Sequence, residues 1–287
     1  MAHETHQVMA IDGGGTRCRV ALVSGDDIYT VETGPANVTT DFDAAIMHIR
    51  LGIEKLLPRL DTSITGIPAY IGLAGVTSTE IAARVETAMP FQTVRVTDDR
   101  PAAVRAAFGS ENGFLAHCGT GSFFASQIEG AMRFCGGWGS VLGDEGSAFW
   151  VGRQALSQTL RIVDGLKPPS PLSKLILNTF GASSGIVRFA SNASPAEIGA
   201  HARLVTQYAG NDDPIAHHIM REGANHVATN LRDMGWAPQT RICLTGGIGP
   251  EYERFLPADM QTSVRAPEAE PLSGAIALAK DLVKETN

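Results

Sequence analysis

The chain has 287 residues and a formal net charge of −7, and 44% of its residues are hydrophobic. This composition is typical of a soluble globular protein, and the length allows two domains with separate cores. The acidic balance argues against nucleic acid as a partner, because binding a polyanion needs an excess of Lys and Arg. The chain contains no signal-peptide pattern at its start and no apolar run long enough for a membrane span. We therefore expect a cytoplasmic protein without a membrane partner.

The first third of the chain alternates between strand and helix patterns. Three strands come first, followed by an amphipathic helix with apolar residues at steps of three and four. A short apolar strand then leads to a helix opened by the capping-box pattern TSTE at 77–80. Another strand ends at the Asp-Asp pair 98–99, before an alanine-rich helix with Pro101 in its first turn. The predicted ranges up to that pair are 7–11, 18–23, 27–32, 41–60, 68–73 and 93–96.

After residue 109 the same order begins again. The predicted elements are strands at 113–118, 123–128, 131–134 and 241–244, helices at 147–160 and 214–233, and a Pro-rich loop at 167–171. Because three strands followed by a helix occur twice, the sequence indicates a duplicated α/β unit. We expect a first domain at 1–109, joined by a C-terminal helix at 272–287, and a second domain at 110–271.

Two glycine-rich turns each interrupt a pair of predicted strands. Residues 12–16 read DGGGT and residues 119–122 read GTGS. Backbone N–H groups in such turns form a concavity suited to phosphate, so we predict phosphate contacts from Gly13, Gly14, Gly15, Thr16, Gly119, Thr120, Gly121 and Ser122. A plain hairpin turn is the alternative, although three glycines would destabilise one through chain entropy. Neither turn matches a Walker or GxGxxG pattern. Asp12 is suited to hold Mg²⁺ through water, because this cation prefers carboxylates and retains waters.

These turns carry a specific resemblance when they are taken together with the late TGG at 245–247. The three motifs resemble the two phosphate motifs and the adenosine motif of the sugar kinase, actin and heat-shock ATPase superfamily. The resemblance implies an α/β fold with two RNase H-like (actin/hexokinase-like) domains and an interdomain cleft. It also implies that Gly246 and Gly247 bind ATP.

A second block narrows the resemblance to one family. GGWG at 136–139 and LGDEGS at 142–147 resemble the N-acetylglucosamine kinase and BadF/BadG/BcrA/BcrD ATPase family, which includes bacterial glucosamine kinases. The similarity extends from about residue 11 to about residue 275 and covers nearly the whole chain. It implies an enzyme that binds ATP and an amino sugar, with both substrates in the cleft.

The resemblance implies a catalytic base among the two aspartates that end the strand before residue 100. In similar kinases an aspartate at this place takes the proton from the sugar hydroxyl. The spacing to GTGS favours Asp99, and Asp98 remains the alternative. Either residue could instead cap the following helix, since Asp is a leading N-cap residue. Arg100 and Pro101 depart from the small or aromatic residues usual in the family, which leaves the local geometry open.

The same resemblance implies a sugar site. Asp144 and Asn37 match family positions that contact the sugar, together with Gly137 and the base Asp99. Asp144 alternatively caps the helix after it, and Asn37 alone would be an ordinary loop residue. Trp138 could stack on the sugar or on a domain interface.

The activity that follows is ATP- and Mg²⁺-dependent transfer of the γ-phosphate to the 6-hydroxyl of N-acetylglucosamine or glucosamine. N-acetylglucosamine is favoured, because the pocket carboxylates Asp99 and Asp144 are assigned to hydroxyl groups and Glu145 is expected to turn away. Muramic or other amino sugars stay open. A homodimer is common among similar kinases, so one is possible here.

Two other functions are compatible with the fold. One is a BadF-type ATPase activator of a reductase, which needs an iron–sulfur cluster and therefore suitable cysteine ligands. The other is a non-catalytic sugar-sensing protein, which would need a DNA-binding segment. The four cysteines form no CxxC pair and are expected to be buried thiols: Cys18, Cys118, Cys135 and Cys243.

Overall fold

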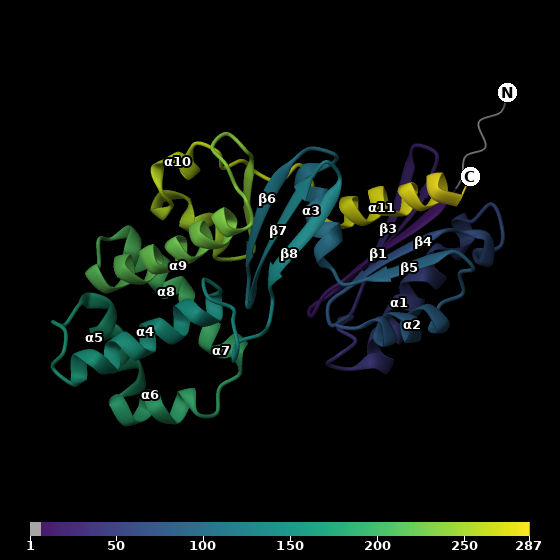
Figure 1. Cartoon of the computed structure of the whole chain (residues 1–287). Helices are drawn as coiled ribbons and strands as arrows, with labels where there is room; N and C mark the ends of the chain where they lie inside the picture. Colours follow the sequence, from purple (N-terminus) through teal and green to yellow (C-terminus); the bar gives the residue numbers. More distant parts are fainter. Residues whose placement is uncertain (1–6, 287) are drawn as a thin grey trace. The chain divides into compact units, whose positions relative to one another are not determined.

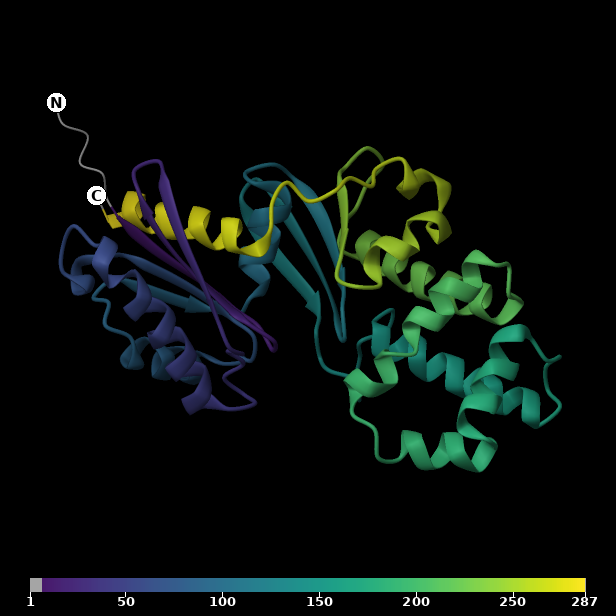
Figure 2. The ribbon, with the colours of Figure 1, turned by 180° about the vertical axis from the view of Figure 1, so that it is seen from behind.

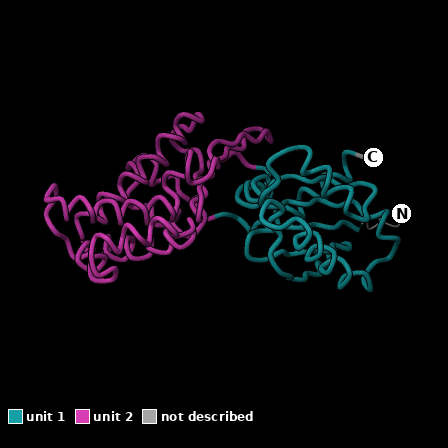
Figure 3. The backbone as a smooth tube through the Cα atoms, turned by 90° about the horizontal axis from the view of Figure 1, so that it is seen from below, with its two compact units in different colours: residues 1–110, 267–287 teal, residues 111–266 magenta. Residues whose placement is uncertain are grey.

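The structure is a computed structural model, and it describes residues 7–286. The described chain divides into two compact units, shown in different colours in Figure 3. Unit 1 contains the residues up to Ser110 and those from Pro267 onward, and unit 2 contains Glu111–Ala266. Within residues 7–286, every helix is too short or too polar to cross a lipid bilayer.

Unit 1 is built on a five-stranded sheet with the order β3-β2-β1-β4-β5. The first three strands form an antiparallel meander, and β4 and β5 run parallel to β1. The strands are β1 (Val8–Gly13), β2 (Cys18–Ser24), β3 (Asp27–Thr33), β4 (Ala69–Leu73) and β5 (Val94–Thr97). The three parallel strands therefore end at one edge of the sheet, where the loops that follow them gather.

Helices cover both faces of this sheet (Figure 1; Figure 2 from behind). Side chains alternate along β1, so that Met9 and Ile11 join one core while Val8 and Ala10 join the other. Because both faces are buried, β1 reads as a continuous apolar run. The first core lies under α1 (Phe42–Leu56) and α2 (Thr79–Ala88), with the short turns η1 (Leu57–Arg59) and η2 (Ile64–Gly66) nearby; α3 (Arg100–Phe108) and α11 (Pro271–Thr286) cover the second.

The start of α2 differs by one residue from the capping-box prediction. Ser78, not Thr77, is the N-cap, and its hydroxyl accepts a hydrogen bond from the Ile81 amide at 3.4 Å. Ser78 has the extended backbone of a cap residue (φ −150°, ψ 162°), which places Glu80 in the first turn. The prediction of a helix was correct, and the cap implied by the capping-box pattern was wrong, because the extended backbone of the N-cap falls at Ser78.

Unit 2 repeats the strand order of unit 1 in a four-stranded sheet, β8-β7-β6-β9. The strands β6, β7 and β8 form an antiparallel meander, and β9 runs parallel to β6. The bounds are β6 (Gly113–Cys118), β7 (Ser122–Ile128), β8 (Ala131–Gly136) and β9 (Ile242–Thr245). The predicted α/β fold with two RNase H-like units is thereby confirmed.

The helical part of unit 2 is larger than the sequence patterns indicated. The elements are α4 (Ala148–Val163), α5 (Pro171–Phe180), α6 (Ser183–Ala190), α7 (Pro195–Gly199), α8 (Ala202–Gly210), α9 (Pro214–Asp233), η3 (Gly249–Phe255) and α10 (Ala258–Gln261). The helix at 214–233 was predicted with the correct bounds, whereas α5 to α8 were not predicted. Helices of this length are marginal alone, and packing on α4 stabilises them through residues such as Ile176 and Val205.

Candidate functional site

The first glycine turn connects β1 to β2 and is held by backbone hydrogen bonds. The Gly14 amide donates to the Arg17 carbonyl at 2.9 Å, which closes the turn. A Cβ atom on Gly13 would lie 2.4 Å from Leu73 Cδ2 and 2.9 Å from Ala36 Cβ, so only glycine fits there. The turn's outer residues, 15–17, are exposed. Their backbone is accessible to a ligand.

Asn37 lies in a loop that is bound to this turn. The Ala36 amide donates to the Gly14 carbonyl at 2.9 Å. The side-chain oxygen of Asn37 accepts from the amides of Thr39 (3.0 Å) and Thr40 (3.2 Å). These bonds orient the side chain and engage its oxygen, so its NH₂ group is the part with donors to offer a ligand.

Asp12 at the end of β1 forms an ion pair that the motif analysis did not anticipate. Its Oδ2 accepts from Arg19 Nη2 at 2.7 Å, and the same guanidinium binds Glu270 just before α11. Asp12 and Arg19 are directly opposite each other in the β1–β2 register. The ion pair fixes the carboxylate at the base of the first glycine turn, and Oδ1 lies outside this bond.

The two aspartates after β5 have different surroundings. Asp98 Oδ1 accepts from the Arg100 amide (2.9 Å) and from Arg100 Nε (2.8 Å), and Oδ2 accepts from Arg100 Nη2 (2.9 Å). Asp99 occupies the N-cap position of α3 without a side-chain cap hydrogen bond. Burial, together with the negative charge of Asp98, raises the pKa of Asp99 to about 6. A base with a pKa near neutrality suits proton transfer at physiological pH.

The parallel strands bring Asp12 and Asp99 to the same edge of the unit 1 sheet. Asp12 lies at the end of β1 and Asp99 follows β5, with β4 between them. The charge of Asp12 contributes to the raised pKa of Asp99. The carboxylate of Asp12, which is paired with Arg19, and that of Asp99, which makes no cap bond, therefore lie at the same edge of the sheet.

In unit 2 the second glycine turn connects β6 to β7. The Gly119 amide donates to the Gly121 carbonyl at 2.9 Å, and the Gly119 carbonyl accepts from the Ala148 amide at the start of α4. The TGG segment packs directly beneath it, since a Cβ atom on Gly246 would lie 2.3 Å from the Cys118 carbonyl oxygen. Gly246 also has a positive φ of 80°. The two predicted ATP-binding motifs of unit 2 are thus in contact.

Asp144 supports the second glycine turn from below. Its Oδ1 accepts from the Ser122 amide at 3.1 Å, and a Cβ atom on Gly121 would lie 2.9 Å from its Oδ2. Burial raises the pKa of Asp144 above its ordinary value. The alternative of a helix cap was wrong, because Ser147 caps α4 through a bond to the Trp150 amide. Asp144 has a positive φ of 64°, which a short polar side chain tolerates.

The loop between β8 and α4 presents its apolar side chains to solvent. The Gly137 amide donates to the Ser122 carbonyl at 2.9 Å, so this residue is adjacent to the second glycine turn. Within this loop Trp138 is 76% exposed, Val141 91% and Leu142 82%. Trp138 therefore has no packing partner within unit 2 that would bury it.

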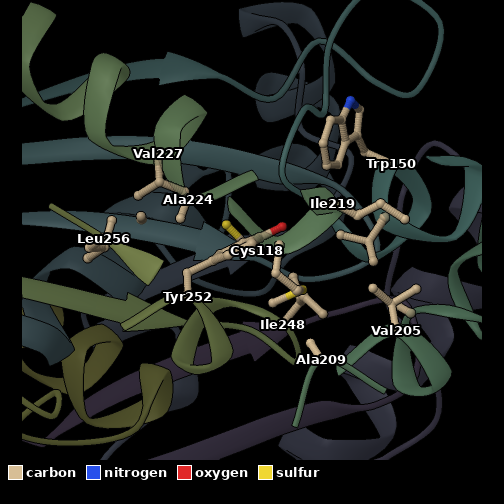
Figure 4. Close-up of a cluster of buried hydrophobic side chains, with 14 of the residues drawn as sticks. Cys118, Trp150, Val205, Ala209, Ile219, Ala224, Val227, Ile248, Tyr252 and Leu256 are labelled. Atoms are coloured by element: carbon tan, nitrogen blue, oxygen red, sulfur yellow. The ribbon is translucent and has the colours of Figure 1, made fainter. Parts of the chain in front are cut away.

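A buried tyrosine that the sequence analysis missed holds the start of α4. Tyr252 Oη donates to the Gly146 carbonyl at 2.8 Å. Gly223 on α9 makes room for the Tyr252 ring, because a Cβ atom on Gly223 would lie 2.4 Å from the Tyr252 hydroxyl oxygen. Figure 4 shows Tyr252 beside Cys118 in the core of unit 2. A glycine in the middle of a helix, which costs about 1 kcal/mol, was the available signal.

The cysteines are free thiols, of which Cys18, Cys118 and Cys243 are buried and Cys135 is half-buried. Among residues 7–286, no three His, Cys, Asp or Glu side chains group together in a way that could hold a metal ion. Asp12 can nevertheless contact a hydrated cation through the oxygen outside its ion pair. Its donor type fits Mg²⁺, which retains several waters and binds one or two carboxylates together with substrate phosphates.

Each unit has the same strand order, with a glycine turn after its first strand. These two features are those of the actin/hexokinase-like class of ATP-binding proteins. The model of the BadF/BadG/BcrA/BcrD ATPase family matches residues 10–279, so the chain belongs to that family.

Relatives and solved structures extend this comparison. The chain is 26% identical over 278 residues to "Glucosamine kinase GspK" of Vibrio cholerae. This match covers 94% of this chain and 95% of that protein. It is 25% identical over 238 residues to "N-acetylmuramic acid/N-acetylglucosamine kinase" of Clostridium acetobutylicum, covering 78% of both. A crystal structure from Chromobacterium violaceum superposes with a TM-score of 0.82 at 25% identity, covering 96% of this chain and 99% of that one.

Proposed function

We propose that the protein is an ATP-dependent amino-sugar kinase that transfers the γ-phosphate of ATP to the 6-hydroxyl of the sugar. The observation that carries the proposal is the contrast between the two aspartates after β5. Asp98 is bound by Arg100, whereas Asp99 makes no side-chain cap bond and has a pKa of about 6. Family membership and the names of the two relatives support an ATP-dependent amino-sugar kinase.

Asp99 acts as the general base. Its carboxylate accepts the proton of the 6-hydroxyl while the sugar oxygen attacks the γ-phosphorus, the bond from phosphorus to the bridging oxygen breaks, and ADP leaves. Such transfer depends mainly on positioning and on neutralising charge. Mg²⁺, when bound, neutralises charge on the β- and γ-phosphates. Asp12 would hold that ion through water, and the ion pair with Arg19 fixes its carboxylate for this task.

The other predicted residues bind and orient the substrates. Backbone amides of the two glycine turns, 13–16 and 119–122, bind phosphate oxygens, and Gly246 and Gly247 contribute to the nucleotide site. The NH₂ group of Asn37 donates to a sugar hydroxyl. Asp144 and Gly137 contact the sugar, and Asp144 also keeps the second turn in shape through Ser122.

N-acetylglucosamine is the preferred substrate in this proposal. Glucosamine is largely cationic at neutral pH and would gain from a free carboxylate near its ammonium group. Asp99 and Asp144 are assigned to hydroxyl groups. The remaining neighbour, Glu145, has its Oε2 3.9 Å from His226 Nε2 on α9, so it is already directed toward another partner.

The test is an ADP-release assay with Mg²⁺-ATP across a panel of sugars that includes N-acetylglucosamine, glucosamine, N-acetylmuramic acid and glucose. We expect the highest kcat/KM for N-acetylglucosamine, with the product phosphorylated at carbon 6 by NMR. Glucosamine used at least ten times more efficiently would overturn the choice of sugar and leave the kinase standing. No sugar-dependent ADP release with any member of the panel would overturn the kinase proposal.

Asp99→Asn keeps the shape of the side chain and removes the base. We expect kcat to fall by about 10²–10⁴-fold with little change in the affinities for sugar and ATP. Burial raises the pKa of Asp99 from 3.8 to about 6, so the stability cost of its charge builds up as the pH rises between these two values and is complete above about pH 6. The variant should therefore raise the melting temperature at pH 7.5 and leave it nearly unchanged at pH 4. A nearly active Asp99→Asn together with an inactive Asp98→Asn would transfer the base to Asp98.

A further inference from the structure

Arg17 is an exposed cation on the first glycine turn. It directly follows Thr16, and its carbonyl accepts a hydrogen bond from the Gly14 amide at 2.9 Å, so its backbone closes the turn. The amides of such a turn offer a phosphate only partial positive charges. A guanidinium offers a full charge and planar donors that match phosphate oxygens. Arg17 therefore adds to this turn what its glycines cannot supply.

The strand register places the Arg17 guanidinium on the same face of the unit 1 sheet as Asp12. Asp12 is opposite Arg19 on β2, and Arg19 is opposite Glu32 on β3. Residues directly opposite each other point to the same face, so these three side chains form a row across the sheet. Arg17 Nη1 lies 3.4 Å from Glu32 Oε2, which directs the guanidinium toward that row. Arg17 and the carboxylate proposed for Mg²⁺ thus share one face.

Arg17 and Arg19 differ in how firmly the protein holds them. Arg19 Nη2 donates to Asp12 Oδ2 at 2.7 Å, its Nη1 binds Glu270, and its side chain is 16% exposed. The contact of Arg17 with Glu32, at 3.4 Å, is longer than the about 2.7–2.9 Å of a strong charged hydrogen bond. Both of its side chains are more than half exposed, and exposed pairs of this kind contribute little to stability. Arg17 can therefore exchange Glu32 for an anionic ligand at small cost.

We propose that Arg17 is a further substrate-binding residue, whose guanidinium leaves Glu32 and binds the terminal phosphate of ATP. The inference rests on the proposed kinase function. The terminal phosphate is favoured because the first glycine turn follows β1 and the proposed base, Asp99, follows β5, at one edge of the unit 1 sheet. The phosphate bound at this edge is the one that the sugar hydroxyl must reach.

A cation at this position assists transfer as well as binding. The transferred group spreads its charge over three oxygens in the transition state, and an arginine directed at them stabilises that charge. Loss of Arg17 should therefore lower both the affinity for a triphosphate and kcat. A surface arginine that only attaches the turn to β3 would affect neither.

The test is a calorimetric titration of Arg17→Met with two nucleotides in the presence of Mg²⁺: ADP and a non-hydrolysable analogue of ATP. Methionine keeps an unbranched apolar stem and removes the charge. We expect affinity for the analogue to fall about ten- to a hundred-fold, the range for a hydrogen bond to a charged group, and affinity for ADP to change less than about three-fold. Arg17→Lys keeps a charge without the planar donors and should recover part of the loss. In the ADP-release assay, kcat of Arg17→Met should fall at least about ten-fold with an unchanged KM for the sugar.

Two control variants separate ligand binding from stability. Glu32→Gln removes the partner of Arg17 and leaves the guanidinium, so affinity for the analogue should stay the same or rise. Arg95→Met removes another exposed arginine, which pairs with Glu285 at 2.6 Å, and should leave both nucleotide affinities unchanged. A loss in Glu32→Gln as large as that in Arg17→Met would show that the pair acts through the fold of the hairpin, and would overturn the inference.

The two nucleotides decide where Arg17 acts. Equal losses for ADP and for the analogue, or unchanged affinity for both in Arg17→Met, would overturn the assignment to the terminal phosphate. The titrations contain no sugar, so they are independent of the sugar panel. A protein that binds the analogue through Arg17 but releases no ADP with any sugar would overturn the kinase proposal alone.

Discussion

Asp12 and Asp144 are two carboxylates whose local bonds restrict what they can do chemically. Asp12 is paired with Arg19 and Asp144 with the Ser122 amide. In both residues the protein binds the carboxylate directly, through a guanidinium at Asp12 and through backbone N–H groups at Asp144. At the scale of single residues, a carboxylate can therefore orient a ligand and stabilise a glycine turn at the same time.

Asp12→Asn removes the charge proposed to act on hydrated Mg²⁺ and keeps the shape of the side chain. We expect the Mg²⁺ concentration for half-maximal activity to rise, with unchanged sugar affinity, because a neutral amide attracts the cation less. A magnesium titration of the initial rate measures this. Glu270→Gln is the matched control, since it removes the other, exposed partner of Arg19 and leaves Asp12 intact. Normal Mg²⁺ dependence in Asp12→Asn would contradict the assignment.

Asp144→Ala removes a charged acceptor from the Ser122 amide and puts a Cβ-bearing apolar residue at a φ of 64°. A hydrogen bond to a charged group contributes about 1.5–3 kcal/mol, so sugar affinity should fall by about ten- to a hundred-fold. The melting temperature should also fall, because the turn loses its support. Asp144→Asn keeps an acceptor and a residue type that tolerates this φ, and should retain most of the stability. Calorimetry measures both quantities. Sugar binding unchanged in the Ala variant would rule out the proposed contact.

At the scale of elements, caps and close contacts position the site. Ser147 and Tyr252 fix the start of α4, which in turn binds the carbonyl of Gly119 in the second glycine turn. The start of α2 depends on Ser78 in the same manner. The start of each helix is held by one or two side-chain hydrogen bonds. The contribution of each bond to the free energy of unfolding can therefore be measured with a single substitution.

Ser78→Ala should lower the free energy of unfolding by about 1 kcal/mol, because the Ile81 amide loses its cap. Thr77→Ala is the control, since this exposed neighbour makes no cap bond to the helix and its loss should change stability by less than about 0.5 kcal/mol. Urea denaturation of both variants gives the two values. A larger loss for Thr77→Ala would restore the cap that the capping-box pattern predicted.

At the scale of the molecule, the end of the chain completes the fold of unit 1. Helix α11 packs on α3 and on the sheet, and the second core of the unit contains Ala275, Ala279 and Leu282 from this helix (Figure 1). The approach to α3 is close: a Cβ atom on Gly274 would lie 2.0 Å from the Ala102 carbonyl oxygen. Residues more than 150 positions apart, such as Ala102 and Ala275, thus build one core.

Gly274→Ala should separate α11 from α3 and lower the free energy of unfolding by about 1–3 kcal/mol, the usual cost of overpacking. Gly210→Ala is a matched control at the end of α8, where a Cβ atom meets nothing within 4 Å. It should be neutral or slightly stabilising, because alanine restricts the unfolded chain. The measurement is the melting temperature of both variants by thermal unfolding. Equal melting temperatures would show that α11 accommodates the extra methyl group of Gly274→Ala.

The sequence by itself determined the features that depend on local periodicity and on backbone chemistry. The strands of both units, the helix Pro214–Asp233 and the two glycine turns follow from apolar alternation, helical spacing and the freedom of glycine. The β1–β2 pairing of Asp12 with Arg19 was within reach as well, because a hairpin closed by a short turn fixes its register.

Only the tertiary structure decided which of two adjacent hydroxyl residues, Thr77 or Ser78, caps α2, because the cap depends on the backbone angles at the start of the helix. It also gave Asp98 and Asp99 their different surroundings. Helices α5 to α8 and the contact of α11 with α3 depend on burial against distant segments. Periodicity within a short window carries no information about such partners, because the stabilising contacts lie far away in the chain.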